Sequence, residues 1–222
     1  MKKPFIIGII SVTIVAVGGG LTWYGLHKDS DSSTSSMAGM NMNTMSGMQS
    51  QFEAYKGEAY DRVFIASMIA HHQGAVEMAT QAQTSALHPE LKTLAGTIIS
   101  DQNVEIAQMQ QWQKDWGFTN DDTKTKDVVK QMNDEMTSMM SQLSGKTGDT
   151  FDKAFLTQMK MHHQSAIDMA KPASTNAQHP EVKTLASNII SAQTKEVNQM
   201  TAWQQSWGYT NDNSSSSSKM NM

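Results

Sequence analysis

The stretch YDRVFIASMIAHHQGAVEMA at residues 60–79 returns as FDKAFLTQMKMHHQSAIDMA at residues 151–170. The match runs without a gap from residues 60–122 to residues 151–213, at an offset of 91, and about half of the positions are identical. Self-similarity of this kind is typical of one supersecondary unit used twice. The fold is therefore expected to contain two copies of whatever this unit forms.

Each copy has the pattern of a helical hairpin. Apolar residues recur at helical spacing, which predicts one helix over about residues 58–86 and a second over about residues 89–116. His88-Pro89-Glu90 is typical of a helix start, because proline fits the first helical position and an acid is favourable in the first turn. His179-Pro180-Glu181 repeats this signal. We therefore interpret the two histidines of these signals as helix-start residues rather than ligands.

Two such hairpins predict an all-α fold in which four antiparallel helices form a bundle. Residues 124–143 predict a further helix that either packs across the bundle or simply connects the copies. A glycine after each second helix, Gly117 and Gly208, predicts its end. We divide the chain into an anchor or signal (1–27), a linker (28–51), repeat 1 (52–122), a connecting helix (123–148), repeat 2 (149–213) and a tail (214–222).

The N-terminus has the pattern of a membrane anchor. Lys2 and Lys3 precede an apolar run from Pro4 to Leu26, about 23 residues, which is long enough to cross about 30 Å of hydrocarbon as a helix. A cleaved signal is the alternative, with Gly18-Gly19-Gly20 near its cleavage site. The positive-inside rule places the rest of the chain on the extracytoplasmic side, at a cell surface or in a periplasm.

The composition limits which metal ligands the chain can offer. The 222 residues include no Cys and 19 Met, and the net charge of −4 argues against a nucleic-acid partner. Thioethers are therefore the available soft ligands, and they suit Cu(I). Residues 37–48 of the linker are rich in Met but poor in bulky apolar side chains, so we expect a segment without packed structure. It either binds Cu(I) or is a linker with incidental methionines.

The helical hairpin brings histidine, methionine and glutamate together. Met68 and the pair His71-His72 fall on the apolar side of the first helix, among Phe64 and Ile65. When the hairpin folds at His88, His71 and Glu105 lie level, each about 25 Å from the turn. The first layer holds Met68, His71, His72, Glu105 and Met109, and the second holds Met159, His162, His163, Glu196 and Met200.

The chemistry of these layers indicates copper. Imidazole suits both oxidation states and thioether suits Cu(I), so we expect Cu(I) to be favoured and Cu(II) to be possible. Glu105 and Glu196 would ligate directly or orient a histidine. The competing interpretation is that the Met stripe is plain core, as a stripe of this spacing often is. The pairs of tryptophans on the second helices are interpreted as core.

The motif M-x-x-H-H-x-x-A-x-x-M, followed by H-P-E and a W-x-x-x-W-G ending, resembles the family called domain of unknown function 305 over about residues 45–213. That family is similar to ferritin-like four-helix bundles, and some members are exported copper-binding proteins tied to copper tolerance. The resemblance implies eight candidate ligands. They are Met68, His71, His72, Met78, Met159, His162, His163 and Met169. Met78 and Met169 enter as ligands through the resemblance alone.

We therefore predict a non-enzymatic, extracytoplasmic copper-binding protein. Its role would be sequestration, buffering or delivery, with a copper transporter or chaperone as a candidate partner. One alternative is a ferritin-like di-iron or copper redox enzyme, but the Glu-x-x-His pair typical of di-iron bundles does not occur. Only Glu105, Glu196, Asp61 and Asp152 would supply core carboxylates to such an enzyme. The other alternative is a surface interaction module without metal.

Overall fold

The computed structural model describes residues 50–209, which are helical and contain no β-strand. The helices are α2 (Glu58–Ser85), α3 (Pro89–Asp115), α4 (Thr123–Leu143), α5 (Gly148–Ala170), the short α6 (Ala173–Asn176) and α7 (Pro180–Ser206). The bounds of α2, α3 and α4 lie within one residue of those predicted from the sequence.

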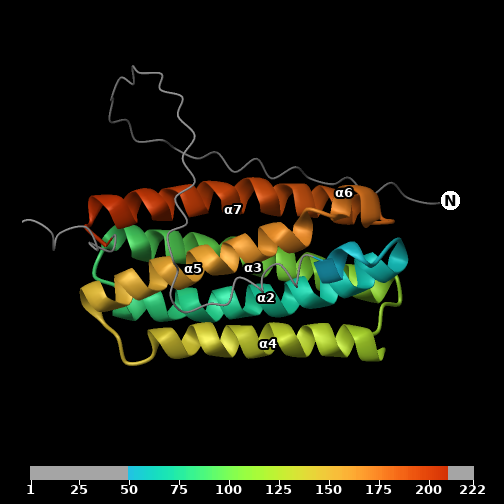
Figure 1. The fold of residues 1–222 in the computed structure, drawn as a ribbon, viewed down its shortest axis with the longest axis horizontal. Helices are drawn as coiled ribbons and strands as arrows, with labels where there is room; N and C mark the ends of the chain where they lie inside the picture. Colours follow the sequence, from blue (N-terminus) through green and yellow to red (C-terminus); the bar gives the residue numbers. More distant parts are fainter. Residues whose placement is uncertain (1–49, 210–222) are drawn as a thin grey trace, which may run out of the picture. The chain divides into compact units, whose positions relative to one another are not determined.

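Four long helices form the bundle, and α4 lies along its side. Helices α2 and α3 make one hairpin, α5 and α7 make the other, and the two hairpins meet through α2 and α5. Helix α4 packs on α2 and α5 and lies on the opposite side of the bundle from α7 (Figure 1). The predicted all-α four-helix bundle of two repeated hairpins is confirmed.

The predicted helix signals are also confirmed. His88 and His179 are the N-cap residues of α3 and α7, and a proline follows each at the first helical position. Gly117 and Gly208 follow the last turns with φ of 66° and 71°, a backbone conformation that glycine adopts without steric cost. Local sequence therefore sets where each hairpin starts and ends its second helix.

The second hairpin differs from the first at its turn. Helix α2 runs unbroken to Ser85, whereas α5 ends at Ala170 and the chain forms the short α6 before α7. Pro172 stands where the first copy has Gln81. Proline has no N–H to donate and clashes with the preceding helical turn, so the helix stops there.

Helix α4 packs closely on α2 at a glycine. A Cβ atom placed on Gly74 would lie 2.5 Å from Met136 Sδ, so a larger residue there would require the Met136 side chain to move. The matching residue of the second copy is Ser165. The apolar face of α4 is buried at Val128, Met132, Met136, Met139 and Leu143. The connecting helix therefore covers one side of the bundle.

Some expectations fall outside the described residues. The anchor predicted for residues 1–27, the linker as far as residue 49 and the tail from 214 to 222 lie there. Between residues 50 and 209, no helix combines the length and the apolar character that a membrane span requires.

Candidate metal centre

Four histidines form a continuous row through the middle of the bundle. His71 and His72 lie on α2, His162 and His163 lie on α5, and all four side chains are fully buried. The rings of His71 and His162 have centroids 3.6 Å apart and planes tilted by 36°. His72 lies 6.3 Å from His71, and His163 lies 5.9 Å from His162. The two layers therefore meet at the His71–His162 pair, and we call these four residues the histidine row.

The two inner histidines are uncharged at neutral pH. Burial lowers the pKa of His71 and of His162 well below the usual value of 6.5, and neighbouring imidazoles lower it further. His162 Nε2 donates to the backbone carbonyl oxygen of His71 at 3.0 Å, which leaves Nδ1 of that ring with the lone pair. A neutral imidazole is the form that binds metal ions.

Each outer histidine contacts a glutamate of its own repeat. His72 Nε2 lies 2.6 Å from Glu105 Oε2 on α3, and His163 Nε2 lies 2.6 Å from Glu196 Oε2 on α7. The first contact is a hydrogen bond, whereas the second has the distance but not the alignment of one. In both, the histidine is buried and the glutamate is partly exposed, by 23% and 18%.

The register of the first hairpin differs by one residue from the predicted one. The sequence places His71 level with Glu105, but His72 is the histidine that reaches it. Adjacent helical residues project about 100° apart, so only one of the two can face α3. His71 faces the other hairpin instead, where it meets His162.

All six candidate methionines are fully buried. They are Met68, Met78, Met109, Met159, Met169 and Met200. The His72–Glu105 contact sets α2 against α3 in the register that also places Met68 opposite Met109.

The methionines lie at two distances from the histidine row. In the second hairpin the His163–Glu196 contact places Met159 opposite Met200, as in the first. By contrast, Met78 and Met169 follow the inner histidines by seven residues, about 10 Å along the helix axis. They lie about two turns from the row.

Several nitrogens of the histidine row have no hydrogen-bond partner within residues 50–209. They are both ring nitrogens of His71, both ring nitrogens of His163, and the Nδ1 atoms of His72 and His162. A buried polar group without a partner costs about 1–3 kcal/mol, so such groups are uncommon unless they serve a purpose. The row thus holds nitrogen donors in a core that offers them no protein partner, which fits a metal ion.

A centre in this row needs more than histidine and carboxylate. In the described part of the chain, no group of three or more His, Asp or Glu side chains is arranged to hold a metal ion. Met68 and Met159 lie one helical turn before His71 and His162, a spacing that places side chains on the same face. Their thioethers are the nearest additional donors by helical spacing.

Two further histidine–carboxylate pairs join the repeats at the ends of the bundle. His88 Nδ1 donates to Asp152 Oδ2 at 2.6 Å, and His179 Nδ1 donates to Asp61 Oδ2 at 2.6 Å. Each aspartate also accepts the backbone N–H of that histidine and of the residue before it. Each aspartate thus caps a helix of the other repeat, and we call these two pairs the end clamps.

The tryptophans complete the end clamps. Trp207 stacks on His88 with ring centroids 3.8 Å apart, and Trp116 stacks on His179 at 3.7 Å. The interpretation of the tryptophans as core is therefore only partly right, since they pack against the core but stay partly exposed. The sequence shows the aspartates and histidines at matching positions but not that they pair between repeats.

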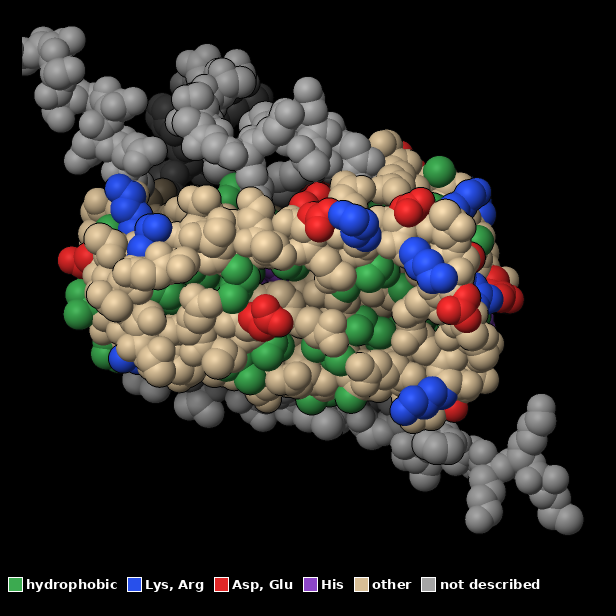
Figure 2. Space-filling model, turned by 90° about the horizontal axis from the view of Figure 1, so that it is seen from below, with side chains coloured by type: hydrophobic (Ala, Val, Ile, Leu, Met, Phe, Trp, Pro, Cys, Tyr) green, Lys and Arg blue, Asp and Glu red, His purple; other side chains and the backbone are tan. Residues whose placement is uncertain are grey.

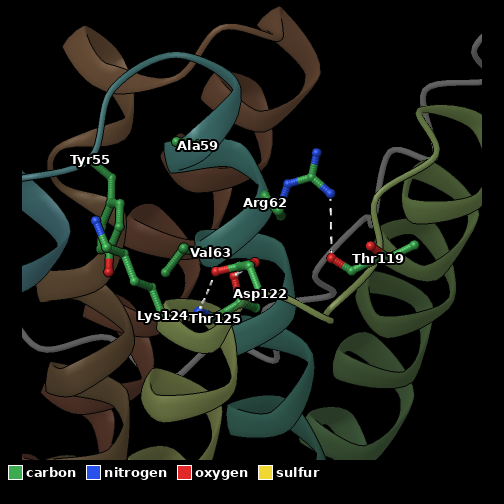
Figure 3. Close-up of a pocket in the computed structure, with 8 residues that line it drawn as sticks. All are labelled: Tyr55, Ala59, Arg62, Val63, Thr119, Asp122, Lys124 and Thr125. Carbon is green, nitrogen blue, oxygen red and sulfur yellow. Dashed lines mark hydrogen bonds between the residues drawn. The ribbon is translucent and has the colours of Figure 1, made fainter.

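On the surface of residues 50–209, no group of three or more His, Asp or Glu side chains is arranged to hold a metal ion. A hollow of about 260 Å³ near the start of α4 is lined by Arg62, Asp122 and Lys124 among others, and contains no candidate ligand (Figure 3). There Asp122 caps α4 by accepting from the Thr125 backbone N–H at 2.9 Å. On the face shown in Figure 2, hydrophobic side chains lie between polar ones and histidine hardly shows, in line with the burial of the row.

Solved structures of similar proteins match this chain. CopM in its Cu(I)-bound form is 36% identical with a TM-score of 0.54, covering 66% of this chain and 96% of that chain. Its Cu(II)-bound form is 37% identical with a TM-score of 0.55, covering 66% and 98%. A protein of Streptomyces coelicolor with a domain of unknown function 305 matches in fold, at 22% identity and a TM-score of 0.58, covering 67% and 93%.

Sequence comparison identifies the family. Among curated proteins, no sequence matches this chain. The profile of the domain of unknown function DUF305 matches residues 21–113, 61–204 and 152–222, and the overlapping matches reflect the internal repeat. The chain belongs to the DUF305 family.

Proposed function

We propose that this chain binds copper in the histidine row, Cu(I) in preference to Cu(II), and that it holds the metal without catalysing a reaction. The observation that carries the proposal is the row itself, four buried imidazoles whose nitrogens largely lack protein partners. Buried methionines lie one turn from it. Imidazole suits both oxidation states and thioether suits Cu(I), so the donor set favours the monovalent ion.

The charges at the ends of the row support a cation there. Glu105 and Glu196 contact His72 and His163, and in the described residues neither glutamate forms an ion pair with Lys or Arg. The inner imidazoles are neutral, so they bring no positive charge of their own. A cation bound in the row would be balanced by the two carboxylates.

The relatives support the choice of metal. CopM, at 36–37% identity, has structures in Cu(I)-bound, Cu(II)-bound and Ag-bound forms. Ag(I) is a soft monovalent ion, and soft ligands such as thioethers suit it as they suit Cu(I). A protein of this family with a row of imidazoles and thioethers is therefore expected to hold the same class of ion.

The role that fits these features is sequestration, buffering or delivery of copper outside the cytoplasm. A site without Cys avoids ligands that form disulfides in an oxidising compartment. The apolar N-terminal run after Lys2 and Lys3 supports export and anchoring at a membrane. Delivery would require a partner such as a copper transporter or chaperone.

A competitive titration of the full chain in detergent tests the proposal. Cu(I) is added against a chelator of known affinity, for the wild type and for His71→Ala/His72→Ala and His162→Ala/His163→Ala. We expect tight binding that weakens in each variant while circular dichroism shows the helices intact. Tight binding that is unchanged in both variants would overturn the proposal.

A matched control separates the row from the segments outside it. In this control the methionines of the linker and tail become leucine. They are Met37, Met40, Met42, Met45, Met48, Met220 and Met222. Binding in the row predicts that this variant retains the high-affinity site, whereas its loss would place the site in the linker and tail.

A further inference from the structure

The connecting helix α4 places methionine sulfur close to His71. Met136 packs against Gly74 of α2, where its Sδ atom lies 2.5 Å from the position that a Cβ atom would take. Gly74 follows His71 by three residues, and residues at that spacing have Cβ positions about 5–6 Å apart on one face of a helix. The sulfur of Met136 therefore lies within about 8 Å of the His71 Cβ atom.

Helices α2 and α4 run in the same direction, and two contacts fix their register (Figure 1). The first is the packing of Met136 against Gly74. The second lies further along both helices, where Gln81 Nε2 donates to Met140 Sδ at 3.8 Å. A step back along α4 from Met136 therefore corresponds to a step back along α2 from Gly74.

This register places a second methionine of α4 near His71. Met132 precedes Met136 by four residues, about 6 Å along the helix axis and on the same face. His71 precedes Gly74 by three residues, about 4.5 Å along its own helix. His71 therefore lies between the levels of Met132 and Met136.

Both methionines belong to the buried face of α4. Met132 is fully buried and Met136 is 6% exposed, and Val128 and Leu143 lie nearer the two ends of the same face. A methionine at such a place either fills an irregular gap in the core or offers its sulfur to a ligand. The residue beside them favours the second, since a fully buried His71 with no hydrogen-bond partner on its ring needs one.

The two inner histidines differ in what surrounds them. His162 Nε2 donates to the backbone carbonyl oxygen of His71, whereas within residues 50–209 neither ring nitrogen of His71 has a partner. The sequence of α4 occurs once, between the two copies, and Ser165 stands where the first copy has Gly74. The sulfur atoms of α4 thus lie against the helix whose inner histidine has both ring nitrogens available.

We propose that Met132 and Met136 of α4 are thioether ligands of copper at His71. This inference rests on the proposed function and extends the set of ligands to a third helix. Imidazole with thioethers suits Cu(I). These ligands are all uncharged, so they add no charge to a core in which an unpaired charge is costly. The connecting helix then takes part in metal binding as well as covering the bundle.

The variant Met132→Leu/Met136→Leu in the full chain in detergent tests these ligands. Leucine conserves most of the volume and the apolar character, an exchange that protein cores tolerate well. We expect chelator competition to show Cu(I) affinity weakened by at least about tenfold, since even the loss of a group that only orients a ligand commonly costs that much. Copper X-ray absorption of the loaded variant should show fewer sulfur ligands than the wild type.

The matched control is Met139→Leu, which removes a buried thioether from the same face of α4, about 9 Å beyond the level of His71. It should leave the affinity and the number of sulfur ligands as in the wild type. Denaturation of the metal-free proteins shows whether either variant changes the fold.

Two results would overturn the assignment of Met132 and Met136 while leaving the proposed function standing. One is an affinity and a sulfur number that the double variant leaves unchanged. The other is an equal weakening in Met139→Leu, because altered packing would then explain the loss. Failure of the wild type to bind Cu(I) would overturn both proposals.

Discussion

The end clamps and the histidine row contain the same pair of groups in opposite arrangements. In the clamps the carboxylates of Asp61 and Asp152 are fully buried and the histidines are partly exposed, by 23% and 26%. In the row the histidines are buried and the glutamates are partly exposed. The clamp carboxylates accept hydrogen bonds from a ring nitrogen and from backbone amides, whereas much of the row lacks partners.

The contrast shows which His–carboxylate pairs stabilise the fold and which are available to bind a ligand. A carboxylate that caps a helix and joins two repeats has its hydrogen-bonding capacity used and contributes stability. Buried imidazoles without partners cost stability and leave lone pairs for a ligand. Substitutions at the clamps should therefore change folding, and substitutions in the row should change metal binding.

The largest effect is expected at the clamps. Asp61→Ala or Asp152→Ala should lower the free energy of unfolding by about 3–5 kcal/mol, because a ring N–H and two helix-start amides lose their acceptor. Chemical denaturation of the metal-free protein, followed by circular dichroism, measures this loss. A change below about 1 kcal/mol would show that the clamps do not carry the fold.

Acid should destabilise the metal-free protein through the inner row. The folded state keeps His71 and His162 neutral, because burial lowers the pKa of each well below 6.5, while the unfolded chain takes up protons there. The free energy of unfolding that depends on their protonation is thus fully present above pH 6.5 and is lost as the pH falls below it. The loss at pH 5.5 should reach up to about 2–3 kcal/mol for the two residues.

The variant His71→Leu/His162→Leu isolates the pH dependence of stability that comes from these two histidines. The difference in free energy of unfolding between it and the wild type should change with pH below 6.5 in favour of the variant. Parallel stability curves for the two proteins between pH 7.5 and 5.5 would contradict the assignment of neutral, buried imidazoles.

At pH 7.5 the same variant should be more stable than the wild type by about 1–2 kcal/mol, since leucine leaves no buried nitrogen without a partner. Its Cu(I) binding in the row should be lost. His88→Leu gives the comparison, because the ring and the backbone N–H of that histidine both donate to Asp152 in a clamp, and it should destabilise the protein instead. Equal effects of the two substitutions on stability would remove the distinction between clamp and row.

The smallest effect is expected at the glutamates that contact the row. Glu105→Gln or Glu196→Gln should weaken Cu(I) affinity about tenfold, as the loss of a partner that orients a metal-bound histidine commonly does. Chelator competition measures the affinity, and stability should change little because both side chains are partly exposed. A weakening of a thousandfold or more would make the glutamates ligands rather than orienting groups.

Much of the fold and of the row could be predicted from the sequence because the information is local. The helix starts at His88 and His179 follow from the proline after each, and the repeat follows from identity at an offset of 91. The pairing of a histidine on α2 with Glu105 on α3 follows from a hairpin with a short turn, to within one residue. Helical spacing alone places these side chains together.

The contacts between the repeats could not be predicted in the same way. Helical periodicity shows that Asp61 and Asp152 lie in apolar stripes, but it does not say which partner they meet. The meeting of His71 with His162 depends likewise on how two hairpins dock. A buried acid at matching positions in both copies, with a histidine at each helix start, is the signal that could have indicated the clamps.

Copper K-edge X-ray absorption of the full chain loaded with Cu(I) identifies the ligand atoms and so decides whether copper is bound in the histidine row. Binding in the row predicts a mixed shell of imidazole nitrogen and thioether sulfur, which stays the same when the linker and tail methionines are replaced by leucine. In His71→Leu/His162→Leu the nitrogen contribution should disappear. A shell of sulfur alone that vanishes with the linker and tail methionines would contradict binding in the histidine row.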